Sequence, residues 1–202
     1  MRAQRQKIGS TSGFTLAETL IAVLILLMVS AVVAGGVPAA LNAYRNAIDA
    51  ANASTLLSTT VNALRDELST AWDVENVPDS NTELVYTSAD TGSRSRIYKK
   101  EENGQHVIML QEYDVDAGAG WLKGEHVIPT AARPLISNAM RQTTRQTGEY
   151  MQVSYDTITY QNGYVTVTGL KVTRGSGDSE TTLAEMPEDG LLIRVMTGGE
   201  GA

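Results

Sequence analysis

The side chains best suited to catalysis are few and scattered in this chain. His106 and His126 are the only histidines, cysteine is absent, and neither histidine lies in a recognised catalytic or phosphate-binding motif. A histidine needs partners at a suitable spacing before it can serve metal or nucleophilic chemistry. We therefore expect a protein that is not an enzyme and that has no disulfides or thiolate metal sites.

Three acidic residues match part of a calcium-binding loop. Asp114, Asp116 and Glu125 fall at the first, third and twelfth places of a spacing that supplies oxygen ligands to Ca²⁺. However, Gly118 stands where another oxygen ligand belongs, and Ala119 stands where the loop needs glycine for its sharp turn. An acidic turn is favoured over a calcium site, and no other metal or cofactor is expected.

Four basic residues lie within a stretch of seven: Arg94, Arg96, Lys99 and Lys100. Such a run is suited to contacting the phosphates of DNA. Glu101 and Glu102 follow at once, no ladder of aromatic residues accompanies the run, and the whole chain has a net charge of −7. We therefore expect a solvated strand face, and we do not expect nucleic acid as a partner.

Glu18 is the most unusual charged residue, because it is the only one between Phe14 and Tyr44. An ionised side chain at the centre of a membrane helix costs on the order of 3 kcal/mol, so residues of this kind are usually functional. The cost is lower near the end of the helix, where Glu18 lies. The sequence therefore indicates a functional carboxylate that needs a positively charged partner.

The apolar run that follows Glu18 is long enough to span a bilayer. Leu20–Val37 has eighteen residues, and Ser30 is its only polar side chain. Arg2, Arg5 and Lys7 precede it, and basic residues of this kind stay on the cytoplasmic side. We expect a single-pass protein of the cytoplasmic membrane, with its amino terminus inside and its acidic remainder outside.

Helical periodicity continues beyond the apolar run. Gly35, Gly36 and Pro38 weaken a helix, so we expect a kink or a locally loosened turn there. Two neighbouring stripes then follow: Leu41, Tyr44, Ile48, Ala51 and Thr55, and next Leu57, Val61, Leu64, Leu68 and Trp72. If both halves join, Phe14–Ala71 forms one helix of roughly 85 Å, so half of it lies outside any small core.

The pattern changes from helical to extended after a turn-rich break at residues 76–81. Strands are predicted at Glu83–Ser88, Arg94–Lys100, Gln105–Tyr113, Met151–Gln161, Tyr164–Arg174 and Leu191–Thr197. Asn162 and Gly163 form the pair preferred in a tight two-residue hairpin turn. Residues 114–148 have no clear pattern, and a short helix near Ile136–Arg145 is one interpretation. The predicted fold class is α+β, with a long amino-terminal helix packed on a carboxyl-terminal antiparallel β domain.

One short segment joins the basic leader to the apolar helix: Gly13-Phe14-Thr15-Leu16-Ala17-Glu18. It resembles the class III signal peptide of type IV prepilins and type II secretion pseudopilins, and the resemblance covers about residues 7–45. Beyond these residues only the architecture agrees, which is a pilin-like fold. The resemblance implies a cleaved leader at 1–13, a membrane and assembly half-helix at 14–37, an amphipathic half-helix at 38–72 and a strand-rich domain at 73–202.

The resemblance also implies roles for individual residues. A prepilin peptidase would cut after Gly13, and Phe14 would become the amino terminus, which is methylated in many members. Glu18 would meet the amine of a neighbouring subunit's Phe14. The implied partners are other pilin or pseudopilin subunits, an inner-membrane assembly platform and the lipid bilayer, and the product is a cell-surface or envelope filament. The position of Pro38 and the run Glu18–Leu26 resemble those of minor subunits.

Three other interpretations remain open. A secretory signal peptide with a cleavage site at Val32-Val33-Ala34 explains the apolar run but not Glu18. A single-span anchor for an extracytoplasmic binding module explains the hydropathy but not the motif at Gly13. A minor pilin that captures DNA would use the basic run that begins at Arg94.

Overall fold

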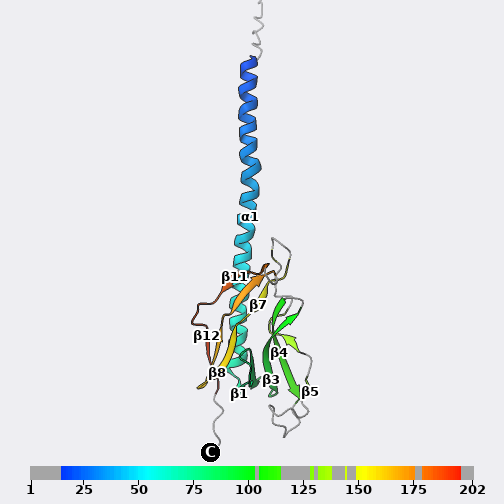
Figure 1. Cartoon of the computed structure of the whole chain (residues 1–202), viewed down its shortest axis with the longest axis vertical. Helices are drawn as coiled ribbons and strands as arrows, with labels where there is room; N and C mark the ends of the chain where they lie inside the picture. Colours follow the sequence, from blue (N-terminus) through cyan, green and yellow to red (C-terminus); the bar gives the residue numbers. More distant parts are fainter. Residues whose placement is uncertain are drawn as a thin grey trace, which may run out of the picture. The chain divides into compact units, whose positions relative to one another are not determined.

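The computed structural model describes residues 15–102, 105–114, 128–129, 132–137, 144, 149–175 and 179–196. One α-helix is followed by strands that pair in antiparallel fashion, so the predicted α+β class is confirmed (Figure 1). The chain divides into two compact units, Met1–Tyr44 and Arg45–Ala202. The predicted domain that begins at residue 73 therefore lies within a larger unit that also includes the second part of the helix.

Helix α1 extends over Leu16–Ser69 without interruption. Gly35, Gly36 and Pro38, where a kink or loosened turn is predicted, lie within this helix. Pro38 cannot donate a hydrogen bond to the Ala34 carbonyl, and no side chain crowds either glycine.

The helix ends earlier than the sequence indicated. Ala71 and Trp72 were predicted to be helical, but α1 stops at Ser69 and Trp72 begins strand β1 (Trp72–Asn76). Asp73 adopts a φ of 52°, which a right-handed helix cannot accommodate. Trp72 instead pairs with Thr87 of the next strand, and its side chain is 44% exposed.

The buried face of α1 lies only in its second part. Every residue from Thr15 to Ala47 is exposed, which includes Leu41 and Tyr44 of the first predicted stripe. Thr55 is exposed as well. The buried positions, which include the predicted Leu64 and Leu68, are Asp49, Ala53, Leu56, Thr60, Leu64 and Leu68.

A six-stranded antiparallel sheet follows the helix. Its order is β1-β2-β3-β4-β5, with β6 also paired to β4. These strands are β2 (Glu83–Thr87), β3 (Arg94–Glu102), β4 (Gln105–Asp114), β5 (Ile128–Pro129) and β6 (Arg133–Pro134). The first three were predicted to within two residues at each end, because each is an alternating run bounded by turn residues.

The second half of the domain is a bent hairpin. Its tight turn is at Asn162 and Gly163, as predicted, and both residues have positive φ values of 52° and 82°. The two predicted strands are each divided, because the ribbon turns a corner where Gly169 has a φ of 63° and the Asp156 N–H donates to the Thr168 carbonyl over 2.9 Å. The resulting strands are β7 (Gln152–Ser154), β8 (Thr157–Gln161), β9 (Tyr164–Thr168) and β10 (Lys171–Arg174).

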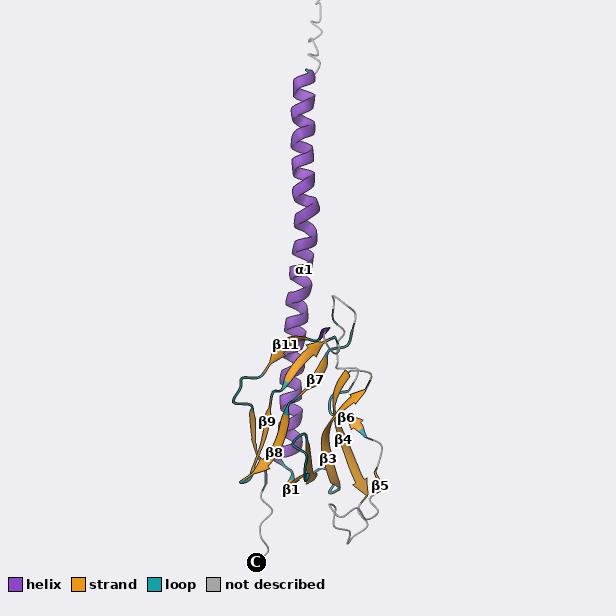
Figure 2. Ribbon diagram, in the orientation of Figure 1, coloured by secondary structure: helices purple, strands orange, loops and turns teal. Residues whose placement is uncertain are grey.

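The corner distributes these strands between two small sheets (Figure 2). One sheet has the order β11-β10-β7 and the other has the order β12-β9-β8. Strand β12 (Leu191–Arg194) was predicted, whereas β11 (Thr181–Glu185) was not. Alternate residues of β12 are buried, and together with the corner residue Tyr155 they join the core against α1.

Side-chain amides link strands that have no backbone pairing. The Asn76 amide donates to the Tyr160 carbonyl over 2.8 Å and accepts from the Tyr160 N–H over 2.7 Å, which joins β1 to β8. On the other side, the His106 N–H donates to Gln152 Oε1 over 2.9 Å, which joins β4 to β7. The three sheets are thereby held in one compact unit.

Candidate functional site

The first candidate site is the exposed apolar surface of α1. Large apolar residues from Leu16 to Met28 are all more than half exposed. Among the residues that the structure describes, α1 is the one helix long and apolar enough to cross a membrane. Contiguous apolar surface of this extent is rare in contact with water. The helix is compatible with a single-pass membrane anchor.

Glu18 lies in the first turn of this surface and forms a capping box with Thr15. The Thr15 N–H donates to Glu18 Oε2 over 3.3 Å, and the Glu18 N–H donates to Thr15 Oγ1 over 3.3 Å. In a capping box each side chain satisfies a backbone amide that the helix start would leave unpaired. This role was not predicted for Glu18, although Thr-x-x-Glu before an apolar run is the signature of a capping box.

The capping box leaves the Glu18 side chain exposed. Its contacts with Thr15 are long, at 3.3 to 3.4 Å, and the carboxylate also lies where the unpaired amides of the helix start favour a negative charge. Gly13 and Phe14, the predicted processing residues, lie outside the described residues. The structure therefore gives Glu18 a local role and leaves its carboxylate accessible to another molecule.

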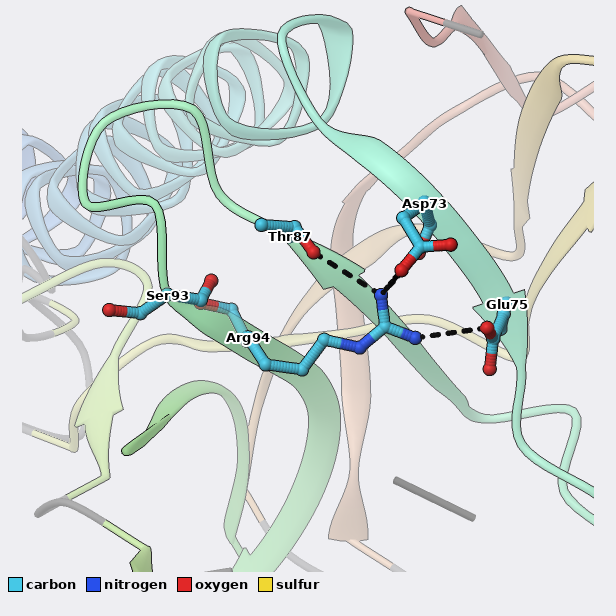
Figure 3. Close-up of polar contacts among 6 residues, drawn as sticks. Asp73, Glu75, Thr87, Ser93 and Arg94 are labelled. Carbon is cyan, nitrogen blue, oxygen red and sulfur yellow. Dashed lines mark hydrogen bonds and ion pairs between the residues drawn. The ribbon is translucent and has the colours of Figure 1, made fainter. Parts of the chain in front are cut away.

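Arg94 is the centre of a second cluster, which Figure 3 shows. Its Nη1 donates to Asp73 Oδ2 over 2.7 Å, to the Asp73 carbonyl over 2.6 Å and to Thr87 Oγ1 over 3.3 Å, while Nη2 is 3.2 Å from Glu75 Oε1. Arg94 is 7% exposed, so the expectation of a solvated side chain is wrong for this residue. Asp73 has a positive φ of 52°, and the cluster ties β3 to β1 and β2.

The other basic residues of the run are also engaged within the fold. Arg96 forms an ion pair with Glu83 and lies 4.9 Å from the ring centre of Tyr98. Burial lowers the pKa of Arg96, but hydrogen bonds to Tyr113 and Glu83 outweigh it and raise the pKa above its ordinary value. Lys99 Nζ donates to the Tyr155 carbonyl over 3.1 Å.

The residues proposed for metal or acid-base chemistry are not brought together where the structure describes them. Asp114 ends β4, whereas Asp116, Glu125 and His126 lie outside the described residues. Within the described ranges, no group of three or more His, Asp or Glu side chains is arranged to hold a metal ion. His106 borders a small apolar cavity with Ile108, Ile136 and Val153, and its Nδ1 is buried without a hydrogen bond.

Comparisons of this chain with protein-family models, with curated proteins and with solved structures find no match. The class that can be stated is structural: an α+β protein with one exposed apolar helix segment and a domain of antiparallel sheets. The features of this structure that bear on function are the apolar helix and Glu18.

Proposed function

We propose that this protein is a prepilin-type structural subunit. It is cleaved after Gly13 and assembled into a type IV pilus or into a secretion or competence pseudopilus. The observation that carries the proposal is Glu18, a lone accessible carboxylate in the first turn of an exposed apolar helix. Glu18 is also the last residue of the motif that begins at Gly13, which supplies a reason for the position of this carboxylate.

The physical argument concerns two environments. Before assembly the apolar part of α1 lies in the bilayer, where Glu18 is near the interface and retains access to water. In a filament the same segment packs among the helices of neighbouring subunits, so Glu18 becomes buried. A buried carboxylate needs a cation, and the free amine of Phe14 on a neighbouring subunit supplies one. A methyl group on that amine leaves its positive charge in place.

The alternatives explain less. A membrane-anchored module that does not polymerise accounts for the exposed apolar helix, but it gives Glu18 no role beyond the capping box. A DNA-capturing subunit would need free basic side chains, whereas Arg94, Arg96 and Lys99 contact groups within the fold. We therefore favour the filament subunit.

Mass spectrometry of the amino terminus tests the proposal directly. Protein purified from membranes of its own host is expected to begin at Phe14, with or without a methyl group. A chain that begins at Met1 or Arg2 in a host with an active prepilin peptidase would contradict the proposal and favour the anchor.

Gly13→Leu is expected to leave the longer precursor in the membrane. A branched side chain before the cut bond would crowd a protease subsite that glycine fits, and the precursor and mature bands differ by the thirteen residues of the leader. Gly9→Leu is the matched control, because it changes a leader glycine away from the bond and should be processed normally. Normal processing of Gly13→Leu would remove the main support for the proposal.

A further inference from the structure

The apolar contacts of α1 with the sheets repeat along the helix axis. Leu56, Thr60, Leu64 and Leu68 are all buried and are spaced four residues apart. One turn of an α-helix is 3.6 residues, or about 5.4 Å, so a slide of one turn towards the amino end puts Thr60, Leu64 and Leu68 in the places of Leu56, Thr60 and Leu64. Three of the four buried places are then filled by another member of the set, so this stripe distinguishes one alignment from the next less than a surface without a repeat would.

Two polar contacts lack this repetition. Asp49 is fully buried on α1, and its Oδ2 is 3.8 Å from Arg174 Nη1 at the end of β10. Five turns further along the helix, the hydroxyl of the fully buried Tyr86 in β2 donates to Glu67 Oε1 over 2.9 Å. Each contact joins one position of the helix to one strand.

A slide in either direction breaks both contacts. Movement towards the amino end puts Ala53 in the place of Asp49 and moves Glu67 one turn away from Tyr86. Movement towards the carboxyl end puts Arg45 opposite Arg174, which brings like charges together, and puts Ala63 opposite Tyr86. The Asp49–Arg174 and Glu67–Tyr86 contacts can therefore form in only one alignment of the helix, whereas several of the buried stripe positions can be filled in more than one.

We infer that the Asp49–Arg174 and Glu67–Tyr86 contacts act as register pins, which fix the axial position of α1 against the sheets. Specifying register is the best-attested use of buried polar groups, since an apolar replacement is often no less stable. Only Thr70 and Ala71 separate α1 from β1, so a slide towards the amino end requires the last helical turn to unwind. Glu67 lies in that turn, and its contact with Tyr86 holds it in place.

The test uses the absence of cysteine from the chain, which allows two spin labels to be placed without other changes. The exposed Ser58 of α1 is labelled together with Thr159 of β8 and, in a second sample, with Glu185 of β11. Distances are measured on the full chain in detergent micelles by electron spin resonance. A single distance is expected for each pair in the otherwise unchanged protein.

The informative variant removes both pins: Asp49→Leu with Arg174→Leu, and Glu67→Gln with Tyr86→Phe. Both charges of the Asp49 pin are replaced together, so no uncompensated charge is left in the core. A second distance is expected in at least one labelled pair, displaced by up to about 5 Å, which is one helical turn. Variants that lose one pin, and the control Asp66→Asn on the exposed face of α1, should keep a single distance.

Two results would overturn the inference. A folded variant without pins that keeps one unchanged distance would show that packing and the short connection fix the register alone. Loss of folding in a variant that lacks only one pin, followed by circular dichroism, would assign the contacts to stability instead.

Discussion

Glu18 illustrates how one residue can act at two stages. In the single chain its carboxylate completes a capping box with Thr15. In the proposed filament the same carboxylate neutralises an amine of the neighbouring subunit. Both Thr15 and Glu18 follow the predicted cut after Gly13, so removal of the leader leaves the cap of the helix intact.

Glu18→Ala is expected to be cut after Gly13 and to span the membrane, but not to enter filaments. Burying the Phe14 amine without its partner costs several kcal/mol, whereas loss of the cap costs about 1 kcal/mol. Glu18→Gln separates the two effects, because glutamine also serves in a capping box but has no charge. It should fail to assemble as well. Sheared surface fractions and membranes, probed for the mature protein, report the outcome.

Normal filament entry by Glu18→Gln would show that capping, and not charge, is the requirement. Entry of Glu18→Ala at the level of the natural protein would show that neither role matters for assembly of this subunit. Processing provides the internal control, since both variants should yield the mature chain in equal amounts.

Tyr86 gives a prediction on pH. Burial, reinforced by the nearby Glu67 carboxylate, raises the pKa of the Tyr86 phenol well above its ordinary value of 10.0. The unfolded chain therefore loses this proton first as the pH rises. The contribution to stability is complete below about pH 10 and is lost above it, by up to about 1.4 kcal/mol per pH unit.

Denaturant unfolding at increasing alkaline pH would measure this slope. In Tyr86→Phe, the free energy of unfolding should fall less steeply with rising pH. Part of the fall should remain, because burial also raises the pKa of Tyr155. A slope that is unchanged in Tyr86→Phe would contradict the assignment.

Among the elements, those with a local signature could be predicted from the sequence. The β2–β4 strands alternate between turns, and Asn162-Gly163 demands a tight hairpin, so both were found. The corner at Asp156 and Gly169 was missed, because each strand looks continuous until its partner bends at the same place. The helix end was missed because Trp72 fits the helical stripe, and only its pairing with Thr87 makes it extended.

Of the two candidate sites, one could be predicted from the sequence and the other could not. Glu18 could be identified because a lone charge in an apolar run needs no tertiary information. The burial of Arg94 could not, because it depends on a bulge in β1 that brings Asp73 and Glu75 to the guanidinium. A run of basic residues in the sequence does not reveal which carboxylates on other strands lie close to each of them.

The hairpin turn of β8 and β9 provides a stability test. Asn162 has a φ of 52°, a left-handed conformation that costs most residues about 1 to 2 kcal/mol. Asn162→Ala should therefore lower the free energy of unfolding by about 1 kcal/mol, whereas Asn162→Gly should leave it nearly unchanged. Urea denaturation measures both. Equal effects of alanine and glycine would mean that the asparagine side chain, and not the backbone conformation, matters.

At the scale of the whole molecule, the division after Tyr44 separates the exposed apolar segment of α1 from the unit that contains all the buried residues of the helix. A chain that begins at Arg45 retains every buried residue of α1 and loses the exposed apolar segment. We expect it to be folded and monomeric, as judged by circular dichroism and sedimentation. A chain that begins at Leu57 is the control, because it lacks Asp49, Ala53 and Leu56 and should not fold stably. An insoluble or unfolded Arg45 chain would place the boundary elsewhere.

The side-chain amide of Asn76, which links β1 to β8, also covers part of the exposed edge of strand β8. Strand β8 is the outermost strand of its sheet, and such a strand normally presents free backbone groups that invite strands of other molecules to add and aggregate. Here the N–H groups of Ile158 and Tyr160 and the Tyr160 carbonyl are occupied by the Asn81 carbonyl and the Asn76 amide. If copies lie side by side, as in the proposed filament, this edge of β8 is therefore not open to the addition of a strand from a neighbouring copy.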